Sequence, residues 1–249
     1  MIFAAGLGTR LRPLTGDRPK ALVEINGRTL LEITLLRLRK FGVREVIINV
    51  HHFADMIVEY LKAHDNFGMR IEVSREDELL DTGGGLKKAA YLFLEDRGRP
   101  EEPFIVHNVD VLSTIDLGRM VQFHTESHAL ATLAAQDRKT VRYLLFDDHD
   151  RLCGRWAGAA EPEFVRPALP ADQQAQFLAF SGIHVVSPRL LAMMSEEGAF
   201  SIITTYLRLA GEGEKILAFR ADEYYWRDLG RPEDVAQASQ DLTDKVIAQ

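Results

Sequence analysis

Cations and glycines are concentrated near the start of the chain, in the segment GLGTRLRPLTGDRPK at residues 6–20. Its four basic side chains stand against one acid, so its formal charge is 4 − 1 = +3, whereas the whole chain carries −7. Glycines let a backbone approach a ligand and present N–H groups to anionic oxygens, and arginine can bind a phosphate with two parallel hydrogen bonds. The segment therefore indicates a site for a small ligand that carries phosphate.

Two common phosphate-binding templates do not fit this segment. The dinucleotide pattern G-x-G-x-x-G fails because Leu11 stands at its third glycine, and the chain lacks the Gly-Lys-Ser/Thr string of a P-loop. What remains is a longer glycine-rich loop in which Arg10 and Lys20 are ten residues apart. Taken alone, the loop also fits a second interpretation, a solvated surface segment that happens to be basic.

Length and composition narrow the class of protein. The 249 residues, 46% hydrophobic and 27% charged, suit one large α/β domain or two small ones. Outside the loop the charge is −7 − 3 = −10, which argues against nucleic-acid or membrane-surface partners. The single cysteine, Cys153, excludes an intramolecular disulfide and is expected to be a buried apolar residue. No signal peptide or membrane-length apolar run is visible, which predicts a cytoplasmic protein of undetermined oligomeric state.

Strand and helix patterns alternate along the first half of the chain. We predict strands at 1–5, 46–50, 69–73 and 103–112, and helices at 29–41, 54–64 and 84–96. Thr29 can cap the helix at 29–41 and Gly42 can end it. Such alternation is typical of βαβ units with a parallel sheet, whose ligands bind outside the carboxyl ends of the strands. The glycine-rich loop and the string HNVD (107–110) both fall at that edge.

The second half of the sequence shows a different pattern, with more predicted strands. Short strand patterns lie at 129–136, 142–147, 151–156, 178–186, 215–219 and 224–230, interrupted by helices at 188–196 and 201–211 and followed by one at 232–248. A proline-rich stretch at 162–174 is expected to be an exposed loop. We predict one domain over residues 1–249, a mixed α/β sheet with a small antiparallel lid portion.

Five motifs in order resemble one enzyme family. AAGLGTRLRPLTGDRPKAL resembles the signature of the sugar-1-phosphate nucleotidylyltransferases, which is G-x-G-T-R, a spacer and P-K. LLDTGGGL (79–86), HNVDV (107–111), FSGIHV (180–185) and YYWRDLGRPED (224–234) follow in the family's order. The chain is similar to the short bacterial type, such as the N-acetylmuramate-1-phosphate uridylyltransferases and the mannose- or heptose-1-phosphate guanylyltransferases. The resemblance implies a Rossmann-like, three-layer, mixed and mostly parallel sheet of the nucleotide-diphospho-sugar transferase type, with residues 128–230 as the sugar-binding and lid portion and 232–248 as a C-terminal helix.

The resemblance also implies a reaction. A sugar-1-phosphate would attack the α-phosphorus of a nucleoside triphosphate, GTP or UTP, in a Mg²⁺-dependent step that releases pyrophosphate. Arg10 would stabilise the leaving phosphates and Lys20 would lie near the reacting centre, whereas Arg12 and Arg18 are expected to be solvated. The implied nucleotide contacts in the loop are Ala5, Gly6, Gly8 and Thr9.

Two aspartates are the candidate metal ligands. Asp110 ends the strand FIVHNVD, beside the candidate nucleotide contact Asn108, and Asp228 stands in the family pattern W-x-D-x-G. Mg²⁺ prefers one or two carboxylates together with phosphate oxygens and water. From the residues alone, Asp110 could instead be a helix cap or turn residue, and Asp228 could form a surface ion pair with Arg227 or Arg231.

Further motif residues are assigned to the base and the sugar. The implied nucleotide contacts here are Thr82, Gly83, Gly84 and Glu78, where Glu78 would read the base. Gly182 would let the sugar approach. The family usually has proline where Leu79 stands, and the Glu-Lys pair that many members use for the sugar phosphate is missing between residues 140 and 175. Its substitutes stay open among Lys139, Arg142 and Arg155.

Other functions fit fewer of these features. A nucleotide-sugar glycosyltransferase could use Asn108-Val109-Asp110 as a D-x-D-like motif, but it does not need the pyrophosphate loop. A non-catalytic sugar-nucleotide-binding module would tolerate loss of Lys20, Asp110 or Asp228, and all three are present. A choline-phosphate substrate would require an aromatic or acidic pocket that no motif supplies. Structural or surface roles are expected for His51, His52 and His107.

Overall fold

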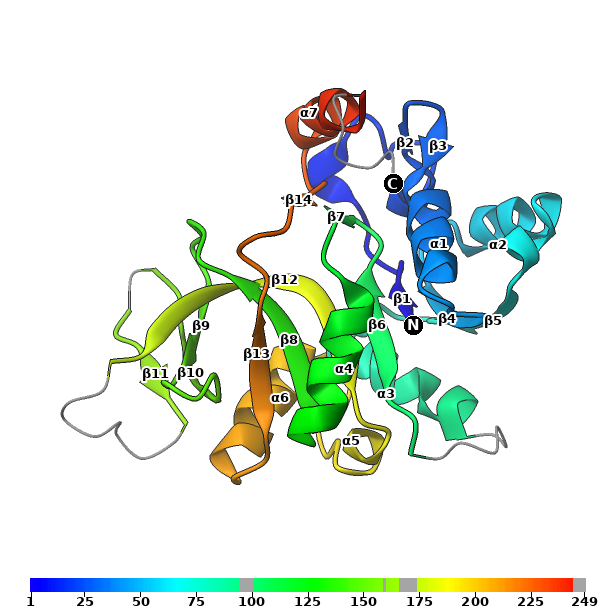
Figure 1. Cartoon of the computed structure of the whole chain (residues 1–249). Coiled ribbons are helices and arrows are strands. Elements are labelled where there is room, and N and C mark those ends of the chain that lie inside the picture. Colours follow the sequence, from blue (N-terminus) through cyan, green and yellow to red (C-terminus); the bar gives the residue numbers. More distant parts are fainter. Residues whose placement is uncertain (95–100, 159, 166–173, 244–249) are drawn as a thin grey trace. The chain divides into compact units, whose positions relative to one another are not determined.

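The computed structural model describes residues 1–94, 101–158, 160–165 and 174–243 (Figure 1). By its internal contacts the chain divides into two compact units. Unit 1 comprises Met1–Asp81, His107–Ile115 and Tyr224–Gln249, and unit 2 comprises Thr82–Val106 and Asp116–Glu223. No helix in the described part of the chain is both long enough and apolar enough to span a bilayer.

Unit 1 contains a small parallel sheet. Its strands follow the order β6-β1-β4-β5, with β1 at Ile2–Phe3, β4 at Glu45–Val50, β5 at Arg70–Arg75 and the last two residues of β6 (Phe104–Asn108). Ile2 pairs with Ile48 on one side and with His107 on the other, so the carboxyl ends of the three strands are aligned. Helices α1 (Leu30–Lys40) and α2 (Ala54–Ala63) connect these strands. The predicted βαβ arrangement is confirmed here.

Helix α1 begins and ends where its sequence predicts. The Thr29 side chain accepts a hydrogen bond of 3.1 Å from the Glu32 N–H, which is an N-cap contact. Leu31, Leu35 and Leu38 are buried at helical spacing. After the helix, Gly42 has a positive φ of 86°, a conformation that favours glycine at a helix end.

Short elements complete unit 1. They are η1 (Thr9–Leu11), η2 (Lys20–Leu22), the hairpin of β2 (Glu24–Ile25) and β3 (Arg28–Thr29), η3 (Asp65–Gly68), β7 (Val111–Ser113), β14 (Trp226–Asp228) and α7 (Pro232–Thr243). The antiparallel pair of β7 and β14 has Asp228 opposite Val111, and the Leu229 N–H donates to the Asp110 carbonyl at 2.8 Å. This pair brings the C-terminal W-R-D motif beside the H-N-V-D motif.

Unit 2 is built on mostly antiparallel strands. Its elements are α3 (Asp81–Leu94, which starts in unit 1), the first residues of β6, α4 (Leu117–Ser127), β8 (Ala131–Gln136), β9 (Tyr143–Phe146), β10 (Leu152–Trp156), β11 (Glu163–Phe164), β12 (Gln176–Val186), α5 (Arg189–Ala192), α6 (Ile202–Gly211) and β13 (Ile216–Arg220). The strand order is β11-β10-β9-β12-β6, and β8 pairs with both β12 and β13. Strand β13 pairs with β8 in parallel, whereas the pairings of β10 with β11, β10 with β9, β12 with β8 and β12 with β9 are antiparallel.

The structure corrects several predicted boundaries. The single strand at 103–112 is two strands, because the chain turns at Val109 and Asp110 and then pairs with β14. Helix α3 starts at Asp81 instead of residue 84, so the three glycines lie inside the helix near its start. The predicted loop at 162–174 contains strand β11, and helix α5 is shorter than 188–196. Residues 166–173 of that loop and 244–248 of the last predicted helix lie outside the described residues.

Candidate active site

The glycine-rich loop of unit 1 is a series of turns on a buried anchor. Leu11 is completely buried, and its N–H donates to the Gly8 carbonyl at 2.9 Å. The Thr15 hydroxyl donates to the same carbonyl at 2.8 Å. Gly8 has a φ of +64°, and a Cβ there would lie 3.0 Å from Thr15 and 3.3 Å from the Lys20 Cβ. Glycine at this position is therefore required by the folding of the loop itself.

The four cations of the loop are in different environments. Lys20 is buried, and its ammonium group contacts the Asp110 carboxylate. Arg10 and Arg12 are exposed. Arg18 pairs with its neighbour Asp17, with 3.0 Å between Nε and Oδ1. Lys20 is thus the loop cation that is fixed against an acid far away in the sequence.

Asp110 and Asp228 lie close enough to influence each other. Burial raises the pKa of the Asp228 carboxyl, and the negative charge of Asp110 raises it further. The positive charges of Lys20 and Arg10 act in the opposite direction on the same pKa. The two predicted carboxylates and the two predicted cations therefore form one electrostatic cluster in unit 1.

Gly230 makes room for this cluster. A Cβ at this position would lie 3.0 Å from Asp228 Oδ2 and 3.3 Å from Arg10 Nη2. Contacts of 3.0–3.4 Å are tight for a Cβ, so a side chain there would displace one of the two groups. The sequence offered a signal for this role in the W-x-D-x-G pattern, but its glycine was not predicted as a site residue.

A buried hydrogen-bond chain lies at the same edge of the parallel sheet. The Ala4 N–H donates to Asn49 Oδ1 at 2.8 Å, and Asn49 Nδ2 donates to Glu76 Oε1 at 2.6 Å. The other oxygen of Glu76 accepts the Leu80 N–H at 3.1 Å. Asn49 is 2% exposed and Glu76 is 5% exposed, and neither was predicted to act in the site.

Comparisons with known proteins assign the family. A sequence model of the nucleotidyl transferase family matches residues 1–144, more than half of the chain. The chain belongs to the nucleotidyl transferase family. The predicted resemblance is confirmed, and the protein is an enzyme of the nucleotidyltransferase class.

Two relatives extend the similarity of this nucleotidyltransferase beyond residue 144. The N-acetylmuramate alpha-1-phosphate uridylyltransferase of Caulobacter vibrioides is 34% identical over 244 residues, covering 94% of this chain and 92% of that protein. The mannose-1-phosphate guanyltransferase of Yarrowia lipolytica is 28% identical over 237 residues, covering 94% of this chain and 61% of that protein.

A solved structure confirms the predicted sheet of the nucleotide-diphospho-sugar transferase type. The UDP-glucose pyrophosphorylase complexed with UDP-glucose matches with a TM-score of 0.76 at 18% identity, over 98% of this chain and 97% of that chain. At this identity the match shows the fold alone.

The nucleotidyltransferase holds its T-G-G-G motif by contacts inside unit 2. The N–H groups of Gly83 and Gly84 donate to the Phe200 carbonyl at 2.8 and 3.3 Å. The Thr82 hydroxyl oxygen accepts the Ile202 N–H at 3.0 Å. A Cβ on Gly83 would lie 2.3 Å from the Phe200 ring. The first of the three glycines therefore has a packing role, and the predicted contact of these N–H groups with a nucleotide stays a prediction.

The remaining predicted residues occupy strand ends, exposed segments and one irregular strand position. Asn108 ends β6, where its carbonyl contacts His107 Nδ1 at 2.7 Å. Glu78 is exposed in unit 1, two residues after the buried Glu76. Gly182 lies in β12 with a φ of 72°, between Phe180 and His184, where the register with β8 shifts.

His107 is structural, as its sequence context predicted. It is 1% exposed, and burial together with the nearby Arg37 charge lowers its pKa to about 3. Its Nε2 contacts Arg37 Nη1 at 3.3 Å, so the neutral ring donates from Nδ1 to the Asn108 carbonyl. Cys153 is buried, as expected.

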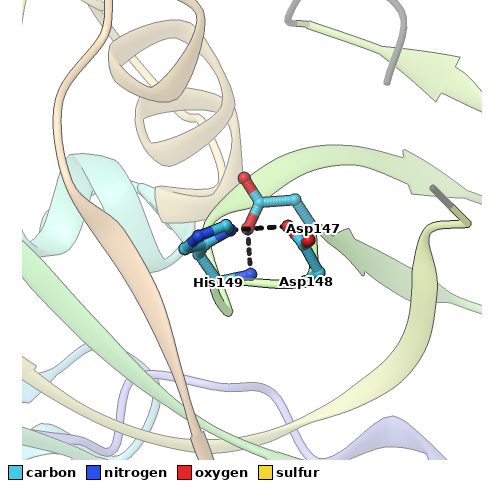
Figure 2. A group of neighbouring side chains, drawn as sticks. All are labelled: Asp147, Asp148 and His149. Carbon is cyan, nitrogen blue, oxygen red and sulfur yellow. Dashed lines mark hydrogen bonds and ion pairs between the residues drawn. The ribbon is translucent and has the colours of Figure 1, made fainter. Parts of the chain in front are cut away.

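One further group of ligand-type side chains lies in unit 2, at the turn between β9 and β10. Figure 2 shows Asp147, Asp148 and His149, whose potential ligand atoms lie within 4.8 Å of one another. Asp147 Oδ1 accepts the backbone N–H groups of His149 at 2.9 Å and Arg151 at 2.8 Å. His149 Nδ1 contacts Asp148 Oδ1 at 2.6 Å. These are the contacts of an aspartate-stabilised hairpin turn, which accounts for the cluster.

Proposed function

We propose that this nucleotidyltransferase transfers a nucleoside monophosphate from a nucleoside triphosphate to a sugar-1-phosphate, forming an NDP-sugar and pyrophosphate. The observation that carries the proposal is the cluster of Arg10, Lys20, Asp110 and Asp228 in unit 1. The similarity to the Caulobacter uridylyltransferase makes UTP and N-acetylmuramate 1-phosphate the first substrates to test. GTP is the second nucleotide to test, because mannose-1-phosphate guanyltransferases are also similar.

The reaction joins two anions, so positive charge must be supplied. A phosphate oxygen of the sugar-1-phosphate forms a bond to the α-phosphorus, and the bond from that phosphorus to the bridging oxygen of pyrophosphate breaks. No protein nucleophile is needed, because positioning and charge neutralisation supply most of the catalysis. Lys20, held by Asp110, would orient the reacting phosphate, and the exposed Arg10 would bind the departing pyrophosphate.

The donor set of unit 1 fits a magnesium ion. Asp110 and Asp228 offer carboxylate oxygens within each other's electrostatic influence, and Mg²⁺ prefers such ligands completed by water and phosphate oxygens. When bound, Mg²⁺ would neutralise phosphate charge and polarise the phosphorus–oxygen bonds. The closeness of two negative charges supports this assignment, because a bound cation would compensate them.

The remaining assignments complete the proposed substrate contacts. The loop backbone at Ala5, Gly6, Gly8 and Thr9 would bind the nucleotide together with Asn108, and the exposed Glu78 carboxylate would accept hydrogen bonds from the base. Thr82, Gly83 and Gly84 would complete the nucleotide contacts, and Gly182 would let the sugar approach. We also propose that the protein is cytoplasmic and that it binds neither nucleic acid nor membranes.

Pyrophosphate release tests this function. The purified chain is incubated with Mg²⁺, each of four nucleoside triphosphates, and a panel that contains the 1-phosphates of N-acetylmuramate, mannose and glucose. We expect pyrophosphate release when UTP or GTP is combined with one sugar 1-phosphate of the panel. The matching NDP-sugar should form at the same time. If no pair releases pyrophosphate, the proposal is wrong. Binding of an NDP-sugar without release would favour the non-catalytic module.

A further inference from the structure

The buried hydrogen-bond chain of unit 1 connects two segments that are far apart in the sequence. At one end is the Ala4 N–H, directly before the candidate nucleotide contacts Ala5 and Gly6. At the other end is the Leu80 N–H, which closes the exposed residues 77–79 onto Glu76. Asn49 and Glu76 stand between these two ends, with 2.6 Å between Asn49 Nδ2 and Glu76 Oε1.

The backbone around Glu76 is also fixed. The Glu76 N–H donates to the Val50 carbonyl at 2.8 Å, and the Glu76 carbonyl contacts His51 Nδ1 at 2.9 Å. Glu76 therefore sits at a fixed position beyond the carboxyl end of β4. The acidic side chain is turned inward to Asn49, whereas the following residues Asp77 and Glu78 are exposed.

The donors and acceptors of this hydrogen-bond chain match only when one of its two side chains is an amide and the other is a carboxylate. Both end groups are backbone N–H donors. The two side chains must therefore supply three acceptor oxygens and one donor, whereas two amides supply two of each. Asparagine accepts at Oδ1 and donates at Nδ2, and the glutamate carboxylate accepts at both oxygens. Two amides would leave two donors facing each other at one of the contacts, and two carboxylates would leave two acceptors facing each other. A buried mismatch of this kind is unfavourable.

We propose that Asn49 and Glu76 are positioning residues for nucleobase recognition. Through their contacts they fix the start of the glycine-rich loop relative to the segment that carries Glu78, and so set the space in which a base is read. This inference rests on the proposed function, because it assumes that both segments contact the nucleotide. It adds to that function two buried residues whose side chains bond to each other and to backbone N–H groups of unit 1.

Exchange of the two groups provides the test. Asn49→Asp and Glu76→Gln each break the donor and acceptor pattern, whereas the double variant Asn49→Asp/Glu76→Gln restores it with the carboxylate moved to the other side chain. We expect each single variant to raise KM for the preferred nucleotide about tenfold and to lower the preference for that base, with a smaller change in kcat. The double variant should return both quantities to within about twofold of the wild-type values.

Controls separate positioning from stability and from the proposed function. Asp55→Asn is the matched acid-to-amide control, because Asp55 forms an exposed ion pair of 2.7 Å with Arg75, the neighbour of Glu76. Thermal unfolding and direct titration of nucleotide binding are measured for every variant. A double variant that binds nucleotide no better than the weaker single variant overturns the inference, as does a loss confined to kcat. If the wild-type chain shows no turnover, the proposed function fails, while the binding titration still decides the positioning role.

Discussion

The two units bury polar side chains of different kinds. In unit 1 the buried polar groups include charged ones, since Lys20 contacts Asp110 and the Glu76 carboxylate is bonded to Asn49. Among the described residues of unit 2, the buried polar side chains are histidines, hydroxyl groups and an amide, and the Arg208–Glu196 ion pair is only partly buried. His124 bridges Thr132 at 2.9 Å and Ser187 at 3.3 Å, and His184 contacts the Tyr206 hydroxyl.

This difference distinguishes residues that stabilise the fold from residues that are proposed to act in the reaction. Burying a charge is costly unless a partner compensates it, so a fold that needs only stability has little reason to do so. Unit 2 joins its buried histidines to hydroxyl groups, whereas the buried networks of unit 1 include charges next to the loop that is proposed to bind phosphate. We therefore expect changes in the unit 1 cluster to affect mainly activity, and changes in the unit 2 core to affect mainly stability.

The largest effect is expected for Asp110→Asn in unit 1. The change removes the charge that contacts Lys20 and one of the two carboxylates proposed to hold Mg²⁺. We expect kcat for pyrophosphate release to fall roughly 10²–10³-fold, the size typical of losing one group that stabilises transition-state charge. The chain should still fold, but at a lower unfolding temperature, because the buried Lys20 ammonium loses its carboxylate partner; Asp55→Asn serves as the control. Activity within a few-fold of wild type would contradict the metal assignment.

Two glycine substitutions, one in each unit, test this comparison directly. Gly83→Ala in unit 2 would place a Cβ 2.3 Å from the Phe200 ring and 2.8 Å from its carbonyl, so we expect the free energy of unfolding to fall by about 1–3 kcal/mol. Gly230→Ala in unit 1 would place a Cβ 3.0 Å from the Asp228 carboxylate and 3.3 Å from the Arg10 guanidinium, which are side-chain ends and not backbone. It should lower kcat/KM about tenfold with little change in stability. Chemical denaturation and steady-state kinetics on both variants measure the contrast, and equal stability losses would argue against it.

A buried histidine in each unit predicts the same response to acid. The pKa of His107 is lowered to about 3 and that of His124 to about 4, mainly by burial. Between these values and the unfolded pKa of about 6.5, the unfolded state binds more protons, so stability falls as pH falls. Each histidine should contribute a slope of about 1 kcal/mol per pH unit near pH 5. Urea unfolding at several pH values measures the slope.

Replacement of one histidine at a time checks this assignment. His124→Gln should flatten the pH dependence of unit 2, whatever its effect on the absolute stability, and His107→Gln should do so for unit 1. An unchanged slope in both variants would show that other groups carry the acid sensitivity.

The sequence predicts the framework better than the positions of side chains. Helix α1 with its Thr29 cap follows from local patterns, because capping and hydrophobic spacing act between near neighbours. The break of the 103–112 segment into β6 and β7 could not be predicted locally, since β7 exists through its pairing with β14, more than a hundred residues later. Asn49 and Glu76 were missed for the same reason, because their role depends on a contact across neighbouring strands.

The smallest effect is expected within the glycine-rich loop itself. Arg18 pairs with Asp17 on the surface, and exposed ion pairs contribute little, so Arg18→Ala should change kcat/KM less than about twofold. Arg10→Ala removes the same formal charge from the loop. Because Arg10 lies beside Asp228, we expect kcat/KM to fall at least about tenfold. Kinetics at two salt concentrations compare the variants. Equal losses that shrink together at high salt would mean that the loop acts through its overall charge, and that the position of Arg10 has no special importance.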